Sequence, residues 1–279
     1  MDASLHKVIN SDTLEALKTF DVRDDDIWLI TYPKAGTTWT AEIINRIQQA
    51  GNREYVVAEN SLLFYPEFSL PGRKPVDEEF ADKTSPRIFV THLPGECLPS
   101  QLLQKNVKVI YVSRNPKDVA VSFFHHHKVD PFIKDYPEWS QFYEDFIKGE
   151  VPYGSWGSHV IYWWNRREQK NVLFLTYEDM KKDLRRNVKL VADFLGKKLS
   201  DESISGITEE CTFQNMKKQN LHKKMIENVF KADHSQSPFV RQGKVSGWKE
   251  YFTVAQNDDF DQRVYPEWIG DSKIQVEFQ

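Results

Sequence analysis

Four short apolar runs stand out along the chain, at residues 28–32, 87–94, 107–112 and 172–177. Short runs rich in β-branched and aromatic residues are typical of buried strands. The segments between the runs carry apolar residues at helical spacing instead. Strands that alternate with helices predict an α/β fold with a mainly parallel central sheet and helices on both of its faces. We expect residues 1–279 to form a single domain.

The first apolar run leads into a short polar loop and then into a helical pattern. The loop contains Lys34, Ala35 and Gly36 and is followed by Thr37 and Thr38. The first N–H groups of a helix have no partner within the helix, and the helix dipole is positive there. Such a point favours a bound anion by about 0.3–2 kcal/mol. The sequence therefore predicts an anion-binding loop that resembles a P-loop in its placement.

The order of residues in this loop differs from that of nucleoside-triphosphate loops. Those loops have Gly, four residues, Gly, then Lys and Ser or Thr. Here Lys34 precedes Gly36, and no second glycine completes the pattern. The residues alone leave two alternatives open, a P-loop nucleotide kinase and a strand-to-helix turn with an incidental lysine.

The second apolar run ends in a polar tip, and polar residues follow the third. His92 lies at the end of one, and Arg114 follows the other. Asn115 suits a helix N-cap and Pro116 suits the first helical position, so Arg114 precedes a second helix start. The carboxyl ends of parallel strands meet at one edge of the sheet, where α/β proteins bind ligands. We therefore expect Lys34, His92 and Arg114 to gather there, although a lone histidine in such a place is more often structural.

The composition limits the classes of partner. The net charge of −4 argues against general binding to nucleic acid or to a membrane surface. No apolar run has the length of a signal peptide core or of a membrane span. Cys97 and Cys211 are the two cysteines, and so few favour a reducing cytosol over a disulfide framework.

Three consecutive histidines, at residues 125–127, invite comparison with a metal site. Consecutive residues of a helix point about 100° apart, whereas metal ligands on a helix are usually three or four residues apart. We expect no metal here, and we interpret the three residues as a partly exposed helix end.

The residues from Tyr32 to Trp39 read Tyr-Pro-Lys-Ala-Gly-Thr-Thr-Trp, which resembles the 5′-phosphosulfate loop of the cytosolic sulfotransferases. Three further segments resemble motifs of that family in the same order. They are Thr-His-Leu-Pro at 91–94, Arg-Asn-Pro-Lys-Asp-Val-Ala-Val-Ser at 114–122 and Tyr-Glu-Asp at 177–179. The resemblance covers nearly the whole chain.

This resemblance implies transfer of a sulfuryl group from 3′-phosphoadenosine 5′-phosphosulfate (PAPS) to a small acceptor. The acceptor would be a hydroxyl or amine compound of hydrophobic or aromatic character, and 3′,5′-diphosphoadenosine (PAP) would be the product. The family's catalytic base corresponds to His92. Lys34 and the loop amides would stabilise the leaving oxygen, so that no metal is needed.

The resemblance also implies which residues bind the nucleotide. Thr37 and Thr38 would hold the 5′-phosphate. Arg114, Ser122 and Arg241 would hold the 3′-phosphate. The residues expected around the adenine or in the loops that border the nucleotide are Lys34, Ala35, Gly36, Trp39, Tyr177, Thr212, Phe213, Gln242 and Gly243.

Several positions depart from the family pattern. Val90 and Gln242 both replace a lysine, which implies one cation fewer in the acceptor pocket and one contact fewer to the 3′-phosphate. Ser246 and Gly247 replace Gly and Asp beside that loop. These departures leave open a non-catalytic nucleotide-binding protein as an alternative. A Golgi carbohydrate sulfotransferase is less compatible with the expected lack of a membrane anchor.

Three further segments carry predictions of their own. Residues 52–86 read as a long irregular connection near the acceptor, and residues 219–238 read as a lid. Residues 249–258, from Lys249 to Asp258, resemble the family's dimerisation motif with Asp in place of its final Glu, which suggests a homodimer. A surface helix start is the alternative for this last segment.

Overall fold

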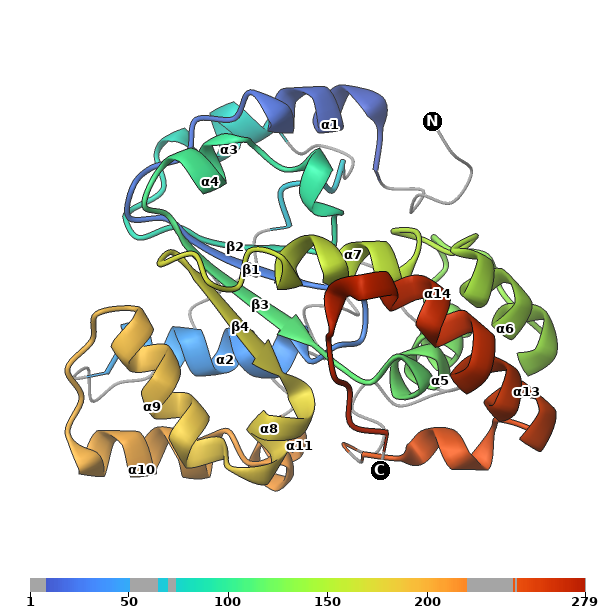
Figure 1. The fold of residues 1–279 in the computed structure, drawn as a ribbon. Helices are drawn as coiled ribbons and strands as arrows, with labels where there is room; N and C mark the ends of the chain where they lie inside the picture. Colours follow the sequence, from blue (N-terminus) through green and yellow to red (C-terminus); the bar gives the residue numbers. More distant parts are fainter. Residues whose placement is uncertain (1–8, 51–64, 70–73, 220–242, 244, 279) are drawn as a thin grey trace.

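The computed structural model describes residues 9–50, 65–69, 74–219, 243 and 245–278, and four parallel strands form the sheet in this part of the chain (Figure 1). The strands are β1 (Ile27–Thr31), β2 (Ile88–Thr91), β3 (Lys108–Ser113) and β4 (Val172–Thr176). Their order across the sheet is β2-β1-β3-β4. The predicted mainly parallel sheet is confirmed.

The strands are apolar on both faces because helices cover both faces. Along β1, Trp28 and Ile30 point into one core, whereas Ile27 and Leu29 point into another. Successive side chains of a strand point to opposite faces, so a strand that is buried on both sides reads as a continuous apolar run. This is why the four runs are visible in the sequence.

The core that contains Ile27 and Leu29 is covered by three long helices. In Figure 1 they lie below the sheet, and they bring Ile43, Val188 and Ile204 to this core. The helices are α2 (Thr37–Gln48), α9 (Leu184–Phe194) and α10 (Asp201–Glu210), with the shorter α8 (Tyr177–Lys182) and α11 (Phe213–Gln219) nearby.

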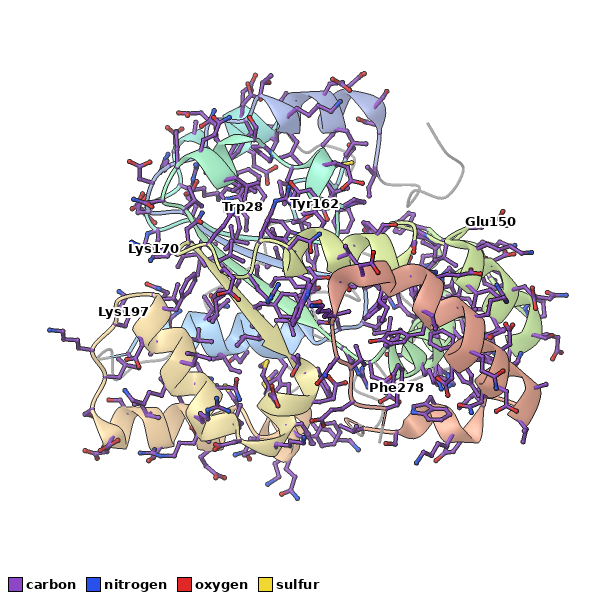
Figure 2. All side chains as sticks on the ribbon, viewed as in Figure 1. Trp28, Glu150, Tyr162, Lys170, Lys197 and Phe278 are labelled. Carbon is purple, nitrogen blue, oxygen red and sulfur yellow. The ribbon has the colours of Figure 1, made fainter. Side chains whose placement is uncertain are left out.

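The other core is larger and richer in aromatic residues. Figure 2 labels Trp28, which lies between the sheet and the helices above it in this view. The helices and turns that contribute to this core are α1 (Ser11–Lys18), α3 (Val76–Ala81), η1 (Gly95–Cys97), α4 (Gln101–Gln104), α5 (Pro116–His127), α6 (Trp139–Lys148), α7 (Trp156–Trp164), η2 (Gly247–Glu250), the π-helical η3 (Phe260–Val264) and α14 (Tyr265–Ile269). Two further elements, α13 (Val254–Asp259) and η4 (Gly270–Ser272), add no buried residue. No helix in the described ranges is both long and apolar enough to cross a bilayer.

Some predicted boundaries were wrong. The connection expected to be irregular over 52–86 contains the helix α3. Tyr177 begins α8 instead of ending a strand, because the Thr176 side chain accepts a hydrogen bond from the Asp179 N–H at 3.2 Å and caps the helix. Residues 220–238 of the expected lid lie outside the described ranges. So do residues 52–64 and 70–73 of the long connection.

Candidate functional site

The anion loop lies between the end of β1 and the start of α2. Lys34 and Gly36 both adopt left-handed backbone conformations, with φ of 68° and 108°. A Cβ atom at Gly36 would lie 2.9 Å from a ring carbon of Tyr177, so glycine satisfies both the backbone and the space. No side chain caps the start of α2, and its first turn holds no acidic residue. The helix start therefore fits a bound phosphate or sulfate group.

His92 follows β2 directly, and β2 is a neighbour of β1 in the sheet. Its Nδ1 lies 2.8 Å from the Thr31 carbonyl oxygen. A carbonyl can only accept, so Nδ1 carries the proton and Nε2 carries a lone pair. Burial lowers the pKa of His92 to about 3 against the opposing effect of its hydrogen bond to Thr31, and the positive charge of Lys34 makes a minor contribution in the same direction as burial. The ring is thus neutral near pH 7 and can accept a proton at Nε2.

Two buried groups hold the backbone of His92 in place. The Glu67 Oε1 atom accepts from the His92 N–H at 3.1 Å. His159 donates from Nε2 to the His92 carbonyl oxygen at 3.1 Å, and its Nδ1 accepts from the Tyr111 hydroxyl at 2.9 Å. Sequence reasoning missed Glu67 and His159, because neither lies in a motif and both act through contacts between distant segments.

Two tyrosine rings flank the imidazole. The Tyr65 and Tyr153 ring centroids lie 5.6 Å and 5.4 Å from that of His92. Tyr153 has a left-handed φ of 71°, an unusual conformation for a residue with a Cβ. The Tyr32 hydroxyl donates to the carbonyl of the next residue, Gly154, at 2.8 Å and so holds the backbone there. The base candidate thus lies among flat aromatic side chains.

Arg114 reaches back to the anion loop. It follows β3, and the next residue, Asn115, caps α5 as predicted by accepting from the Lys117 N–H. The Arg114 Nη1 atom donates to the Lys34 carbonyl at 3.0 Å. Its guanidinium carbon also lies 4.3 Å from the centre of the Tyr177 ring. Ser122 is half-buried two turns into α5. The structure thus brings Lys34, His92 and Arg114 to the same edge of the sheet.

The predicted adenine residues form two adjoining groups. Trp39 and Tyr177 make an edge contact at 5.3 Å, and the Trp39 indole N–H donates to the Cys211 carbonyl at 2.8 Å. Phe213, two residues further on, lies against Gly243, whose φ is +58°. A Cβ atom at Gly243 would lie 2.2 Å from the Phe213 ring.

The remaining predicted nucleotide residues divide into those placed and those not described. The Thr212 hydroxyl accepts from the Asn215 N–H at 3.4 Å at the start of α11. Arg241 and Gln242 lie outside the described residues.

Residues 24–273 match the sulfotransferase domain family. Sulfotransferase 1A1 of Mus musculus is 40% identical over 256 residues, which cover 90% of this chain and 87% of the mouse protein. Sulfotransferase 1C2 of Rattus norvegicus is 37% identical over 267 residues, or 94% of this chain and 89% of the rat protein. The chain belongs to the sulfotransferase family.

Solved structures agree with this assignment. This sulfotransferase superposes on mouse sulfotransferase SULT7A1 complexed with PAP with a TM-score of 0.81, at 34% identity over 96% of this chain and 92% of that one. It superposes on retinol dehydratase in complex with androsterone and inactive cofactor PAP with a TM-score of 0.85, at 26% identity over 97% of this chain and 89% of that one.

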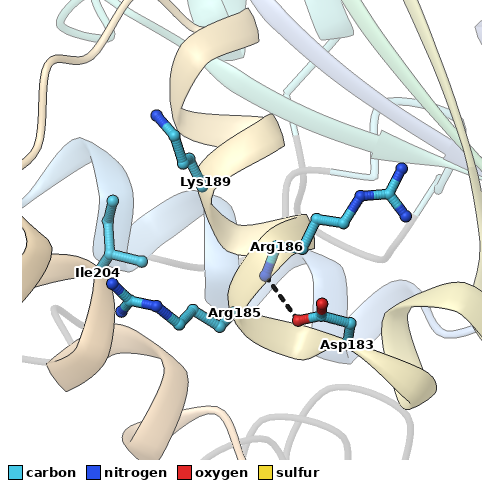
Figure 3. A pocket seen from close by; sticks show the side chains of 5 residues that line it. All are labelled: Asp183, Arg185, Arg186, Lys189 and Ile204. Carbon is cyan, nitrogen blue, oxygen red and sulfur yellow. Dashed lines mark hydrogen bonds between the residues drawn. The ribbon is translucent and has the colours of Figure 1, made fainter.

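A surface pocket of this sulfotransferase lies apart from the predicted site residues (Figure 3). It is lined by the side chains of Asp183, Arg185, Arg186, Lys189 and Ile204, none of which is a predicted site residue. The Arg185 guanidinium is paired with the Asp201 carboxylate at 2.8 Å, and Lys189 with Asp193 at 3.1 Å. The side chains of Arg185 and Lys189 are thus engaged in exposed surface ion pairs.

The three histidines at the end of α5 diverge. The His125 Nε2 atom lies 2.6 Å from the Tyr251 hydroxyl, and His126 lies 3.3 Å from Asp130. His127 is buried and bonds through Nδ1 to the Lys134 carbonyl at 2.5 Å. The interpretation of all three as a partly exposed helix end was wrong for His127, which packs against the ring of Phe123.

Proposed function

We propose that this sulfotransferase transfers a sulfuryl group from PAPS to a hydroxyl or amine group of a small acceptor and releases PAP. The observation that carries the proposal is the neutral Nε2 of His92 beside a helix start that fits an anion. The two superposed relatives are described as complexes with PAP, which supports the nucleotide.

His92 acts as the general base in this proposal. Its Nε2 takes the proton of the acceptor as the acceptor's oxygen or nitrogen attacks the sulfur in line with the leaving oxygen. The Nδ1–H, held by the Thr31 carbonyl, keeps the ring in the tautomer that this step needs. A base in this position typically contributes about 10²- to 10⁴-fold to the rate.

The anion loop stabilises the charge that develops on the leaving oxygen. Lys34 supplies a positive charge, and the first amides of α2 supply oriented N–H groups. Preorganised donors of this kind act as an oxyanion hole does. Thr37 and Thr38, at the start of α2, hold the 5′-phosphate. Lys34 serves where a phosphoryl-transfer enzyme would use Mg²⁺.

The rest of the nucleotide binds at the same edge of the sheet. Arg114 and Ser122 hold the 3′-phosphate together with Arg241. Trp39 and Tyr177 enclose the adenine. The residues that complete this nucleotide site in the proposal are Ala35, Gly36, Thr212, Phe213, Gln242 and Gly243.

The acceptor is hydrophobic or aromatic in this proposal. The rings of Tyr65 and Tyr153 lie 5.6 Å and 5.4 Å from the imidazole of His92. Flat apolar molecules gain most from such surroundings. The unpaired thiols of Cys97 and Cys211 support a location in the cytosol.

We further propose a homodimer formed through residues 249–258. Thr253 starts α13 with a capping box, in which its hydroxyl and the Gln256 side chain each accept from the other's backbone N–H. This rigid start presents Val254, whose side chain is 79% exposed. Single exposed apolar residues are common on protein surfaces, so the proposal rests on the resemblance of this segment to the family's dimerisation motif.

Transfer of label from [³⁵S]PAPS to a panel of phenols, steroids, alcohols and amines tests the proposed reaction. We expect transfer in the presence of EDTA, and tighter binding of PAP than of ATP. Tight binding of PAP with no transfer across the panel favours the non-catalytic alternative. Tighter binding of ATP favours the kinase.

Arg114→Ala tests the proposed 3′-phosphate site. Loss of a charge-assisted contact of about 1.5–3 kcal/mol should weaken PAP binding about 10- to 100-fold by calorimetry. Adenosine 5′-monophosphate lacks the 3′-phosphate and serves as the control ligand, since the substitution should change its affinity far less. Equal losses for both ligands would show that Arg114 acts through the loop alone.

A further inference from the structure

One threonine joins the anion loop to the proposed base. Thr31 is the last residue of β1 and is fully buried. Its hydroxyl oxygen lies 2.6 Å from the hydroxyl oxygen of Thr37, the first residue of α2. The same oxygen lies 3.2 Å from Nδ1 of His92.

The direction of these hydrogen bonds follows from their acceptors. The Thr31 carbonyl can only accept, so Nδ1 of His92 is protonated and offers no lone pair. The Thr31 hydroxyl oxygen therefore accepts a share of the Nδ1–H, which leaves its own hydrogen able to point to Thr37, although by distance alone either hydroxyl of that pair can donate. The Thr37 hydroxyl then accepts from Thr31, and its own hydrogen remains for an acceptor at the helix start. The chain of donors runs from the imidazole to the anion loop.

We propose that Thr31 is a positioning residue, whose hydroxyl couples a phosphate or sulfate group in the anion loop to the tautomer of His92. This inference rests on the proposed function, in which His92 is the base. An anion that accepts from Thr37 makes the Thr37 oxygen a better acceptor for Thr31, and the Thr31 oxygen in turn a better acceptor for Nδ1–H. Hydrogen bonds in a chain polarise one another in this way. A filled loop thus holds the lone pair of His92 at Nε2, where the acceptor's proton arrives.

The chain offers a matched pair of variants. Thr31→Val removes the hydroxyl and keeps the branched shape, and Thr31→Ser keeps the hydroxyl. We expect kcat of Thr31→Val to fall about 2- to 10-fold, the equivalent of one hydrogen bond, because the Thr31 carbonyl still orients the ring. The Kd for PAP should stay within about threefold, since Thr31 does not itself bind the anion. Thr31→Ser should behave as the wild type does.

A direct readout is the tautomer of His92 by ¹⁵N NMR of the histidine-labelled full chain, with His92→Ala to assign the signals. PAP should shift the Nδ1 and Nε2 signals further towards the Nδ1–H form in the wild type and in Thr31→Ser. The shift should be lost or reduced in Thr31→Val. Adenosine 3′-monophosphate lacks the 5′-phosphate and should leave the signals unchanged in all three proteins.

Two results would overturn the inference. One is an equal response of the tautomer to PAP in Thr31→Val and in the wild type. The other is an equal loss of kcat in Thr31→Ser and Thr31→Val, which would assign the effect to packing. Failure of the wild type to transfer sulfuryl groups would instead defeat the proposed function, and the NMR response to PAP would remain a separate result.

Discussion

At the scale of single residues, the site depends on histidines that burial keeps neutral. Burial lowers the pKa of His92 to about 3 and that of His159 to about 4. Each ring also has one nitrogen committed to a carbonyl oxygen, which fixes where its proton lies. A general base must be deprotonated before it reacts, and these surroundings keep His92 deprotonated at neutral pH.

The pH dependence of the rate should reflect this lowered pKa. The active form of His92 is unprotonated, so its population is complete well above the pKa and falls as the pH drops through about 3. We therefore expect kcat/KM for an alcohol acceptor, which does not itself titrate, to stay level between about pH 5 and 8. A histidine with an ordinary pKa would give half the plateau rate at about pH 6.5. A tenfold decline between pH 7 and 5.5 would contradict the assignment.

The sequence identified the residues at strand ends but not those that support them. His92 and Arg114 were predicted because polar residues that follow parallel strands gather at one edge of the sheet. The structure confirms that they lie there together with Lys34. Glu67 and His159 could not be predicted, because their roles arise from contacts with the His92 backbone across 25 and 67 positions of the chain.

At the scale of elements, the start of α5 fixes the segment that follows Gly243. Asp118 accepts from the Ser246 N–H at 2.9 Å and from the Trp248 N–H at 3.0 Å. Its neighbour Lys117 is buried, pairs with Asp261 at 2.6 Å and lies 4.4 Å from the Trp248 ring centre. The helix that begins beside Arg114 therefore also anchors the chain that follows Gly243, a residue of the proposed nucleotide site.

Asp118→Ala should destabilise this anchoring. It leaves two backbone N–H groups without their acceptor, at about 1–3 kcal/mol for each group, so the free energy of unfolding should fall by about 2–6 kcal/mol. Asp118→Asn keeps one acceptor oxygen and should lose about half as much. Urea unfolding of the three proteins measures the difference. Equal stability of Asp118→Ala and the wild type would show that water satisfies both groups.

The elements were predicted best where local chemistry determines them. The start of α5 follows from Asn115 and Pro116, which are suited to the N-cap and first helical positions. Helix α3 was missed because the prolines around it indicated a loop, although Pro75 precedes it as an N-cap residue.

At the scale of the whole molecule, the strand order places the site. Strand β1 lies between β2 and β3, so the loop after β1 is flanked by the residues that follow both neighbours. The fold class was predictable because both faces of every strand contribute apolar side chains to the two cores, so that the runs are mainly apolar. The extent of the domain stays a prediction, and the sulfotransferase match covers residues 24–273.

The proposed dimer is a prediction at this scale. Val254→Glu should convert a dimer to a monomer in sedimentation velocity, because a charge cannot be buried unpaired at an interface without large cost. Leu190→Glu is the matched control, since Leu190 is the other large hydrophobic residue that is exposed in the described part of the chain. A monomeric wild type, or a dimer that persists in Val254→Glu, would show that this segment is not the dimer contact.

The central claim is that His92 is the base for sulfuryl transfer, and single-turnover transfer from [³⁵S]PAPS by His92→Ala tests it most directly. His125→Ala, which alters a histidine bonded to Tyr251, is the matched control. We predict that His92→Ala binds PAP as the wild type does and transfers the group about 10²- to 10⁴-fold more slowly. The control should retain its rate. Transfer by His92→Ala at a rate close to the wild type, with PAP binding intact, would contradict the account.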